Sequence, residues 1–188
     1  MAQTRPAPGT WTYEDLFGLP DDGKRYEIIE GELYEMPSPT LDHATVIANL
    51  IAMLIPLVTR LGGRWFTAPL DVFLEGANPV QPDIVVILPG WSGSLPRRGV
   101  EGAPDLVIEV LSPSNRGHDL LTKRALYARA GVREYWMLDP EARTIEILAL
   151  DRDALHLVAV SSGADVPVSP LLGSLPITAA ALFAGIEE

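Results

Sequence analysis

Cysteine is absent from the 188-residue chain, which excludes disulfide-stapled scaffolds, thiolate zinc sites and cysteine nucleophiles and favours a cytoplasmic location. Histidine is scarce, and His43, His118 and His156 are too widely spaced to form a zinc-binding motif. The sequence also has no GxSxG elbow, glycine-rich phosphate loop or dinucleotide fingerprint. The sequence therefore contains no motif that would indicate a serine hydrolase, a nucleoside triphosphatase or a dinucleotide-dependent redox enzyme.

Long apolar runs are missing too. The longest, residues 44–58, has 15 positions and contains Asn49 and Pro56, whereas a bilayer span needs about 20 apolar residues. We therefore expect a buried helix there and no association with a membrane. Residues 1–11 lack the apolar run of a signal peptide and are expected to form a flexible arm before a single domain at 12–188.

Basic residues are outnumbered: 14 Lys and Arg against 25 Asp and Glu give a formal net charge of -11. Such a charge repels polyanions unless basic residues cluster locally. Hydrophobic residues make up 47% of the chain, which is enough to build one core in a domain of this length.

Helical and strand patterns alternate along the chain between proline and glycine breaks. Helices are expected at 12–17, 41–61, 119–130 and 178–183. Strands are expected at 65–67, 71–74, 82–88, 105–111, 134–139, 143–150 and 155–160, and residues 25–36 form two short strands or one strand bent at Gly31. This order predicts an α/β fold, a mixed central sheet (α+β) with helical cover.

Glu109 is the anomaly of the strand at 105–111. Successive side chains of a strand point to opposite faces, and both faces are otherwise apolar, as in a central strand. Burying an ionised carboxylate there costs several kcal/mol of folding free energy unless a cation or hydrogen-bond donors compensate it. We expect a positive partner, which makes Glu109 either a metal-binding or catalytic acid or a structural acid paired with an arginine.

Asp83 is the candidate partner of Glu109. Pairing the strands at 82–88 and 105–111 in antiparallel fashion, with Leu88 opposite Pro104, sets Asp83 opposite Glu109. Opposed residues have Cβ atoms about 4.5–5.5 Å apart, close enough to share a divalent cation. Asp83 otherwise simply begins a strand. Asp105, four residues before Glu109 on the same strand, is interpreted as a turn residue.

Positive charge follows directly downstream. Residues 116–133 contain five bases and the single acid Asp119. On a helix Asp119, Lys123 and Tyr127 share one face. A basic run on a helix commonly forms a solvated face, but the short link to the strand of Glu109 favours a site role for Lys123.

These segments carry a resemblance to a known family. The chain reads RYEIIEGELYEMPSP, then His43 at the start of a long helix, PDIVV, APDLVIEVLSPSNRGHDLLTKRALYARAGVREYW and MLDPEARTIEIL. Over about residues 12–185 it is similar to the Uma family of restriction endonucleases, a branch of the PD-(D/E)xK nuclease superfamily. The resemblance implies a restriction-endonuclease-like core, a mixed sheet flanked by helices that acts as a metal-dependent phosphodiesterase.

The resemblance also implies site residues. Asp83 and Glu109 stand for the superfamily's two acids, but Leu111 occupies the place of its lysine, and the lysine of this family corresponds to Lys123 in the next helix. Glu27, Gly31, Glu32 and His43 match the family's pattern. For Glu27, Glu32 and His43 a secondary site role competes with a structural one, such as a helix cap for His43, and Tyr127 is a further secondary candidate.

The resulting hypothesis is a Mg²⁺-dependent or Mn²⁺-dependent DNA endonuclease. Asp83, Glu109 and the backbone carbonyl of Val110 would bind the metal, and Lys123 would act on the attacking water or the phosphate. The candidates for DNA backbone contacts are Arg97, Arg98, Arg116 and Arg124.

The alternative is a nuclease-fold binding or regulatory module that acts with a partner protein, which the net charge and Leu111 favour. A homodimer would supply the second active site for cutting two strands. The tail at 166–183 carries no charge, and we expect it to cover the core of its own chain or of a second copy.

Overall fold

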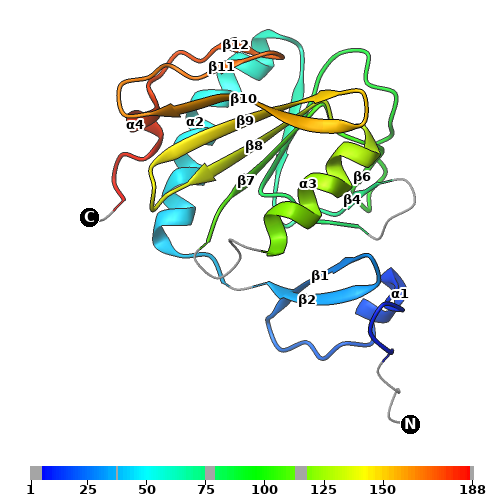
Figure 1. The fold of residues 1–188 in the computed structure, drawn as a ribbon. Coiled ribbons are helices and arrows are strands. Elements are labelled where there is room, and N and C mark those ends of the chain that lie inside the picture. The colour runs from blue at the N-terminus through cyan, green and yellow to red at the C-terminus, as the bar shows by residue number, and fades with distance from the viewer. Residues whose placement is uncertain (1–5, 37, 75–78, 113–117, 187–188) are drawn as a thin grey trace.

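A six-stranded mixed sheet forms the centre of the computed structural model, which describes residues 6–36, 38–74, 79–112 and 118–186. Its strand order is β10-β9-β8-β7-β5-β3 (Figure 1). The β7–β8 pair is parallel and the others are antiparallel. The strands are β3 Arg64–Thr67, β5 Ile84–Ile87, β7 Leu106–Val110, β8 Glu134–Asp139, β9 Thr144–Asp151 and β10 Ala154–Ser162. The predicted mixed sheet with helical cover is confirmed.

Helices cover both faces of this sheet. The helix α2, Leu41–Arg60, packs on one face and α3, His118–Ala130, on the other (Figure 1). Ile108 and Trp136 belong to the apolar layer under α2, and Val107 and Tyr135 belong to the layer under α3. All four side chains are fully buried. Because burying a large side chain stabilises by about 1.5–3 kcal/mol, these two layers hold β7 in place at the centre of the sheet.

The long helix α2 differs from the expectation in one respect. It begins after Thr40, whose side chain accepts a hydrogen bond from the His43 backbone N–H, and it continues through Pro56 to Arg60. Only one face is buried. Its length of 20 residues and mean hydropathy of 1.8 are sufficient for a membrane span, so the prediction that this segment is too short was wrong. The buried face packs on the central sheet, as in a core helix.

The N-terminal region forms a small unit beside α3. The helix α1, Tyr13–Leu16, precedes β1, Arg25–Ile29, and β2, Glu32–Met36. The strands form an antiparallel hairpin, so the prediction of two strands holds. Glu30 and Gly31 at its turn have φ values of 53° and 78°, the primed geometry that a two-residue hairpin needs. Ile28 and Ile29 are buried, which anchors the hairpin below the sheet (Figure 1).

The remaining elements are short. They are β4 Val72–Phe73, β6 Val100–Glu101, β11 Val168–Ser169, β12 Gly173–Ser174 and α4 Ala179–Leu182. The three strands β6, β11 and β12 were not predicted, because two residues show no periodicity. Leu175, Leu182 and Phe183 are buried in the layer under α2, so the uncharged tail covers the core of its own chain.

Candidate active site

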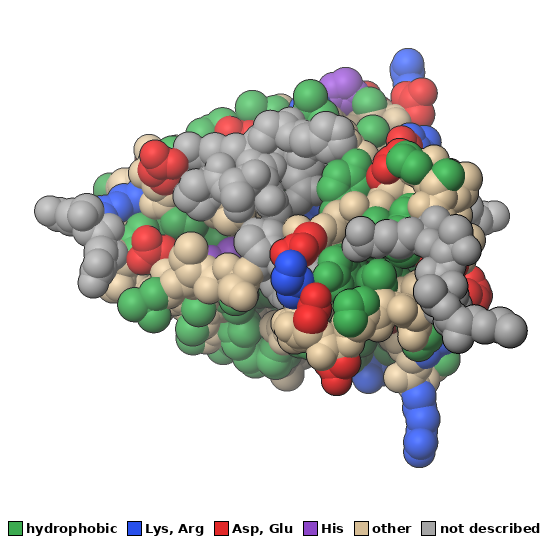
Figure 2. All heavy atoms as spheres, turned by 90° about the horizontal axis from the view of Figure 1, so that it is seen from below, with side chains coloured by type: hydrophobic (Ala, Val, Ile, Leu, Met, Phe, Trp, Pro, Cys, Tyr) green, Lys and Arg blue, Asp and Glu red, His purple; other side chains and the backbone are tan. Residues whose placement is uncertain are grey.

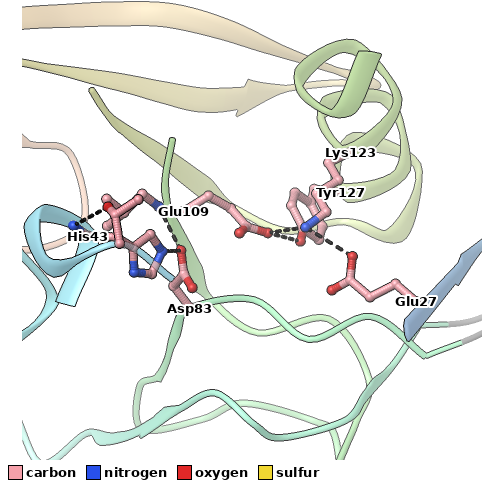
Figure 3. Close-up of polar contacts among 8 residues, drawn as sticks. Glu27, His43, Asp83, Glu109, Lys123 and Tyr127 are labelled. Carbon is pink, nitrogen blue, oxygen red and sulfur yellow. Dashed lines mark hydrogen bonds and ion pairs between the residues drawn. The ribbon is translucent and has the colours of Figure 1, made fainter. Parts of the chain in front are cut away.

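Glu109 lies near the carboxyl end of β7, where it meets the inner face of α3 (Figure 3). Its side chain is buried, and its Oε1 accepts hydrogen bonds from Lys123 Nζ at 3.1 Å and from the Tyr127 hydroxyl at 2.7 Å. The positive partner expected for Glu109 is therefore a lysine. The helix face shared by Lys123 and Tyr127 is directed at the strand and is not a solvated face.

Lys123 is itself enclosed, with only 3% of its surface exposed. Besides Glu109, it lies 3.2 Å from Oε2 of Glu27, a residue of β1 that is 1% exposed. Oε1 of Glu27 accepts a hydrogen bond from the Gln81 backbone N–H at 2.8 Å. The ammonium is thus held between a carboxylate of the central sheet and a carboxylate of the N-terminal hairpin.

The pKa of Glu109 reflects this environment. The pKa is raised from its ordinary value of 4.5 to about 8: burial contributes most to the rise, the carboxylates of Asp83 and Glu27 add to it, and Lys123 and the Tyr127 hydroxyl oppose it. Burial likewise raises the pKa of Tyr127 well above 10, so its hydroxyl stays a donor. A buried acid that titrates near neutral pH beside other acids is typical of a functional site.

Asp83 stands immediately before β5, on the side of the site that faces α2 (Figure 3). Its Oδ2 accepts hydrogen bonds from the Val110 backbone N–H at 2.8 Å and pairs with His43 Nε2 at 3.0 Å. Both side chains are partly open, with 14% and 15% of their surfaces exposed. The cap of α2 is Thr40 and not His43, so the interpretation of His43 as a helix cap is wrong, and its ring instead contacts the carboxylate of Asp83.

The predicted register of β5 and β7 is correct: Ile84 pairs with Ile108 and Val86 with Leu106. The side chains of the two acids nevertheless contact different helices: Asp83 contacts His43 of α2, and Glu109 contacts Lys123 of α3. Within the described ranges, no group of three or more His, Cys, Asp or Glu side chains is arranged to hold a metal ion. Two separate hydrogen-bonded groups result, one of Asp83 with His43 and one of Glu109 with Lys123 and Tyr127. They are connected by the hydrogen bond from the Val110 backbone N–H to Asp83.

A groove opens beside Asp83. Its volume is about 290 Å³, and Asp83 and His43 lie at its polar end. The rest of the lining is mainly apolar and consists of Pro39, Ala44, Ile47, Ala48, Ile51, Thr67 and Ala68. Solvent-sized molecules can therefore approach Asp83, whereas Lys123 and Tyr127 are closed off.

The described bases of the stretch at 116–133 contact acceptors within the chain. Arg124 donates to the Leu155 carbonyl at 3.0 Å, Arg129 pairs with Glu30, and Arg133 pairs with Asp105. These contacts join α3 and its flanks to neighbouring elements, so charge counted along the sequence overstated the charge available to a ligand. Arg116 lies outside the described residues. On the face in Figure 2, acidic side chains are scattered among hydrophobic ones and basic side chains stand singly.

The other secondary candidates lie away from the buried cluster. Arg98 donates to Glu101 at 2.8 Å and sits 4.4 Å from the centre of the Phe73 ring. Arg97 and Glu32 are exposed. DNA contacts by these arginines stay a prediction.

Asp105 has a structural role, but it links neighbouring segments and does not simply form a turn, as the sequence suggested. Its side chain accepts hydrogen bonds from the Leu88 backbone N–H at 2.7 Å and from Arg133 at 2.8 Å, at the opposite end of the β5–β7 pair from Asp83. We expect Asp105→Ala to lower the free energy of unfolding by about 1–3 kcal/mol, because it leaves the Leu88 N–H unpaired. Urea denaturation would measure this loss. Any nuclease activity per folded molecule should be unchanged, and a selective loss of activity would contradict the structural role.

Sequence reasoning missed the pairing of Glu27 with Lys123 and the residues that support it. Gln81 Nε2 donates to Asp71 at 2.9 Å, and the Tyr13 hydroxyl donates to the same carboxylate at 2.9 Å. A signal was present in β1, where Glu27 shares the inward face of the strand with Ile29. An acid at an inward position indicates a buried partner.

The fold belongs to the restriction-endonuclease-like class. The crystal structure of "a putative nuclease belonging to DUF820" from Anabaena variabilis matches with a TM-score of 0.72 at 20% identity, over 93% of this chain and 98% of that chain. The chain belongs to the Uma2 family, described as "Putative restriction endonuclease", whose model matches residues 13–180. The resemblance found in the sequence is thereby confirmed. Among curated proteins, none matches the chain.

Proposed function

We propose that the protein is a Mg²⁺-dependent or Mn²⁺-dependent endonuclease that hydrolyses phosphodiester bonds in DNA. The observation that carries the proposal is that Glu109, with its partner Lys123, and Asp83 lie where β5 and β7 pair, with Asp83 bound to the backbone N–H of Val110 next to Glu109. Membership of the Uma2 family supports DNA as the substrate. The metal ligands in this proposal are Asp83, Glu109 and the backbone carbonyl of Val110.

The side chains fit a hard divalent cation. Both hydrogen bonds of the Asp83 carboxylate end on Oδ2, and those of Glu109 end on Oε1, which leaves Oδ1 and Oε2 as oxygen donors. Mg²⁺ prefers oxygen ligands and commonly uses one or two carboxylates while it keeps several waters. A cage of three acidic side chains is therefore not required. The raised pKa of Glu109 also indicates a carboxylate that lacks sufficient positive charge.

The chain's own residues supply the rest of the chemistry. A bound divalent cation would lower the pKa of a water molecule and polarise the scissile phosphate. Lys123 would contribute a fixed positive charge beside Glu109, which offsets the negative charge that develops on the phosphate. Tyr127 and His43 hold Glu109 and Asp83 in position through their hydrogen bonds. Family resemblance supports products with 5′-phosphate ends.

A binding or regulatory module is the second candidate. Leu111 stands where the superfamily's lysine is expected, and the described bases of α3 are engaged within the chain. Such a module would bind a partner without cleaving DNA. A metal titration separates the nuclease from the regulatory module in part, because a module that only binds a partner protein need not hold a divalent ion.

Nicking of supercoiled plasmid tests the proposal. The wild-type protein is expected to nick in Mg²⁺ or Mn²⁺, and EDTA should stop the reaction. Asp83→Asn keeps the size of the side chain but removes a charged metal ligand, so it should be inactive while still folded by circular dichroism. Equal inertness of the wild type and Asp83→Asn over a range of metals and salt would exclude the nuclease. Equal nicking by both would exclude this site.

A further inference from the structure

Glu27 is the acid of the buried cluster that the proposed chemistry leaves without a task. It comes from the hairpin β1–β2, outside the central sheet, and reaches Lys123 from the side opposite Glu109 (Figure 3). We propose that Glu27 is a positioning residue that fixes the Lys123 ammonium for phosphodiester hydrolysis. The inference rests on the proposed function and adds to it a contribution from the N-terminal hairpin.

The geometry favours a clamp over a single ion pair. A lysine side chain carries a compact charge on a flexible four-carbon stem, so a single contact fixes the position of the ammonium poorly. Here Lys123 Nζ lies 3.1 Å from Glu109 and 3.2 Å from Glu27. Glu109 also has to present its other oxygen to a metal ion in the proposed site. Glu27 has no such second task, so it can hold the ammonium throughout the reaction.

Charge balance points the same way. When Glu109 is ionised, as it would be as a metal ligand, Asp83, Glu27 and Glu109 bring three negative charges to the site and Lys123 brings one positive charge. One divalent cation makes this set neutral. Without Glu27 the set would carry a net positive charge with the cation bound, and repulsion between the cation and the Lys123 ammonium would no longer be offset. Glu27 thereby allows the lysine and a metal ion to occupy adjacent places.

The position of Glu27 is itself fixed. Its other oxygen accepts a hydrogen bond from the Gln81 backbone N–H at 2.8 Å, and the hairpin is anchored by the buried Ile28 and Ile29. Burying a carboxylate is unfavourable, and an apolar side chain would anchor a hairpin at least as well. The burial of Glu27 is therefore better explained by Lys123 than by hairpin stability.

The chain offers a matched control for the test. Glu27→Gln keeps the shape of the side chain and an oxygen for the Gln81 N–H but removes the charge. Glu30→Gln makes the same change on the same hairpin, opposite the same helix, at a pair whose side chains are 58% and 59% exposed. We expect Glu27→Gln to lower kcat of nicking by about 10–100-fold with little change in KM, and Glu30→Gln to match the wild type. Glu27→Asp, which retains the charge, should recover part of the loss.

A second readout does not depend on nicking. The chain has two lysines, Lys24 and Lys123, so their ammonium ¹H–¹⁵N resonances can be assigned by substitution. A buried, clamped ammonium exchanges its protons slowly, and the Lys123 signal should be visible in the wild type and in Glu30→Gln but broadened or shifted in Glu27→Gln. An unchanged signal with unchanged kcat in Glu27→Gln would overturn the inference. If the wild type shows no metal-dependent nicking, the proposed function fails, and the resonance alone decides whether Glu27 positions Lys123.

Discussion

Glu109→Gln is expected to make the protein more stable and at the same time unable to nick DNA. If Glu109 is a metal ligand, as proposed, its removal forfeits several kcal/mol of stabilisation of the transition state, which corresponds to a loss of at least about 100-fold in rate. The gain in stability has a separate cause. Glutamine keeps an oxygen for the Tyr127 hydroxyl and removes a carboxylate whose ionisation burial opposes.

The gain should depend on pH in a defined direction. The pKa of Glu109 is about 8 in the folded protein and 4.5 ordinarily, so between these values the folded state holds a proton that the unfolded state has lost. Wild-type stability therefore falls as pH rises through this window, by up to about 1.4 kcal/mol per unit, and levels off above pH 8. Glu109→Gln lacks this contribution, and its advantage grows from pH 5 to pH 8.

Urea denaturation in EDTA at pH 5, 6.5, 8 and 9 measures this difference, with Glu30→Gln as the control because its carboxylate is exposed. Parallel stability curves for the wild type and Glu109→Gln would contradict the raised pKa. Retained nicking by Glu109→Gln would contradict its role as a metal ligand. The two outcomes are independent, since one concerns the metal-free protein and the other the reaction.

The parts of the fold predicted correctly are those with strong periodicity or burial. The register of β5 and β7 followed from two apolar strands and the loop between them, because a slip by one residue would turn every side chain to the other face. The helix α3 was bounded to within one residue by its spacing and by Gly131. The strand β6 could not be predicted, since it pairs with β4 from a distant part of the chain, and the strands β11 and β12 of the local hairpin have only two residues each.

The site was predictable in its local part only. Glu109 and Lys123 are linked by one strand and one helix, so a buried acid and a nearby helical base could be matched from spacing. Glu27 reaches the same lysine through the packing of a hairpin from a distant part of the chain, which no spacing encodes. The contact of Arg124 with the Leu155 carbonyl of β10 was not predictable for the same reason, and its contact with DNA stays a prediction.

Lys123→Met is expected to destabilise the protein by about 3–5 kcal/mol, because it leaves the carboxylates of Glu27 and Glu109 buried without their ammonium partner. The loss should be smaller in a Glu27→Gln background, where one of the two carboxylates is already neutral, and a double-mutant cycle from urea denaturation measures that coupling. Lys24→Met is the matched control, since the other lysine of the chain forms a solvent-exposed pair with Glu35, and its stability should stay close to the wild-type value. Equal losses for Lys123→Met in both backgrounds would show that Glu27 and Lys123 do not interact, and the buried cluster would then owe its stability to Glu109 and Tyr127 alone.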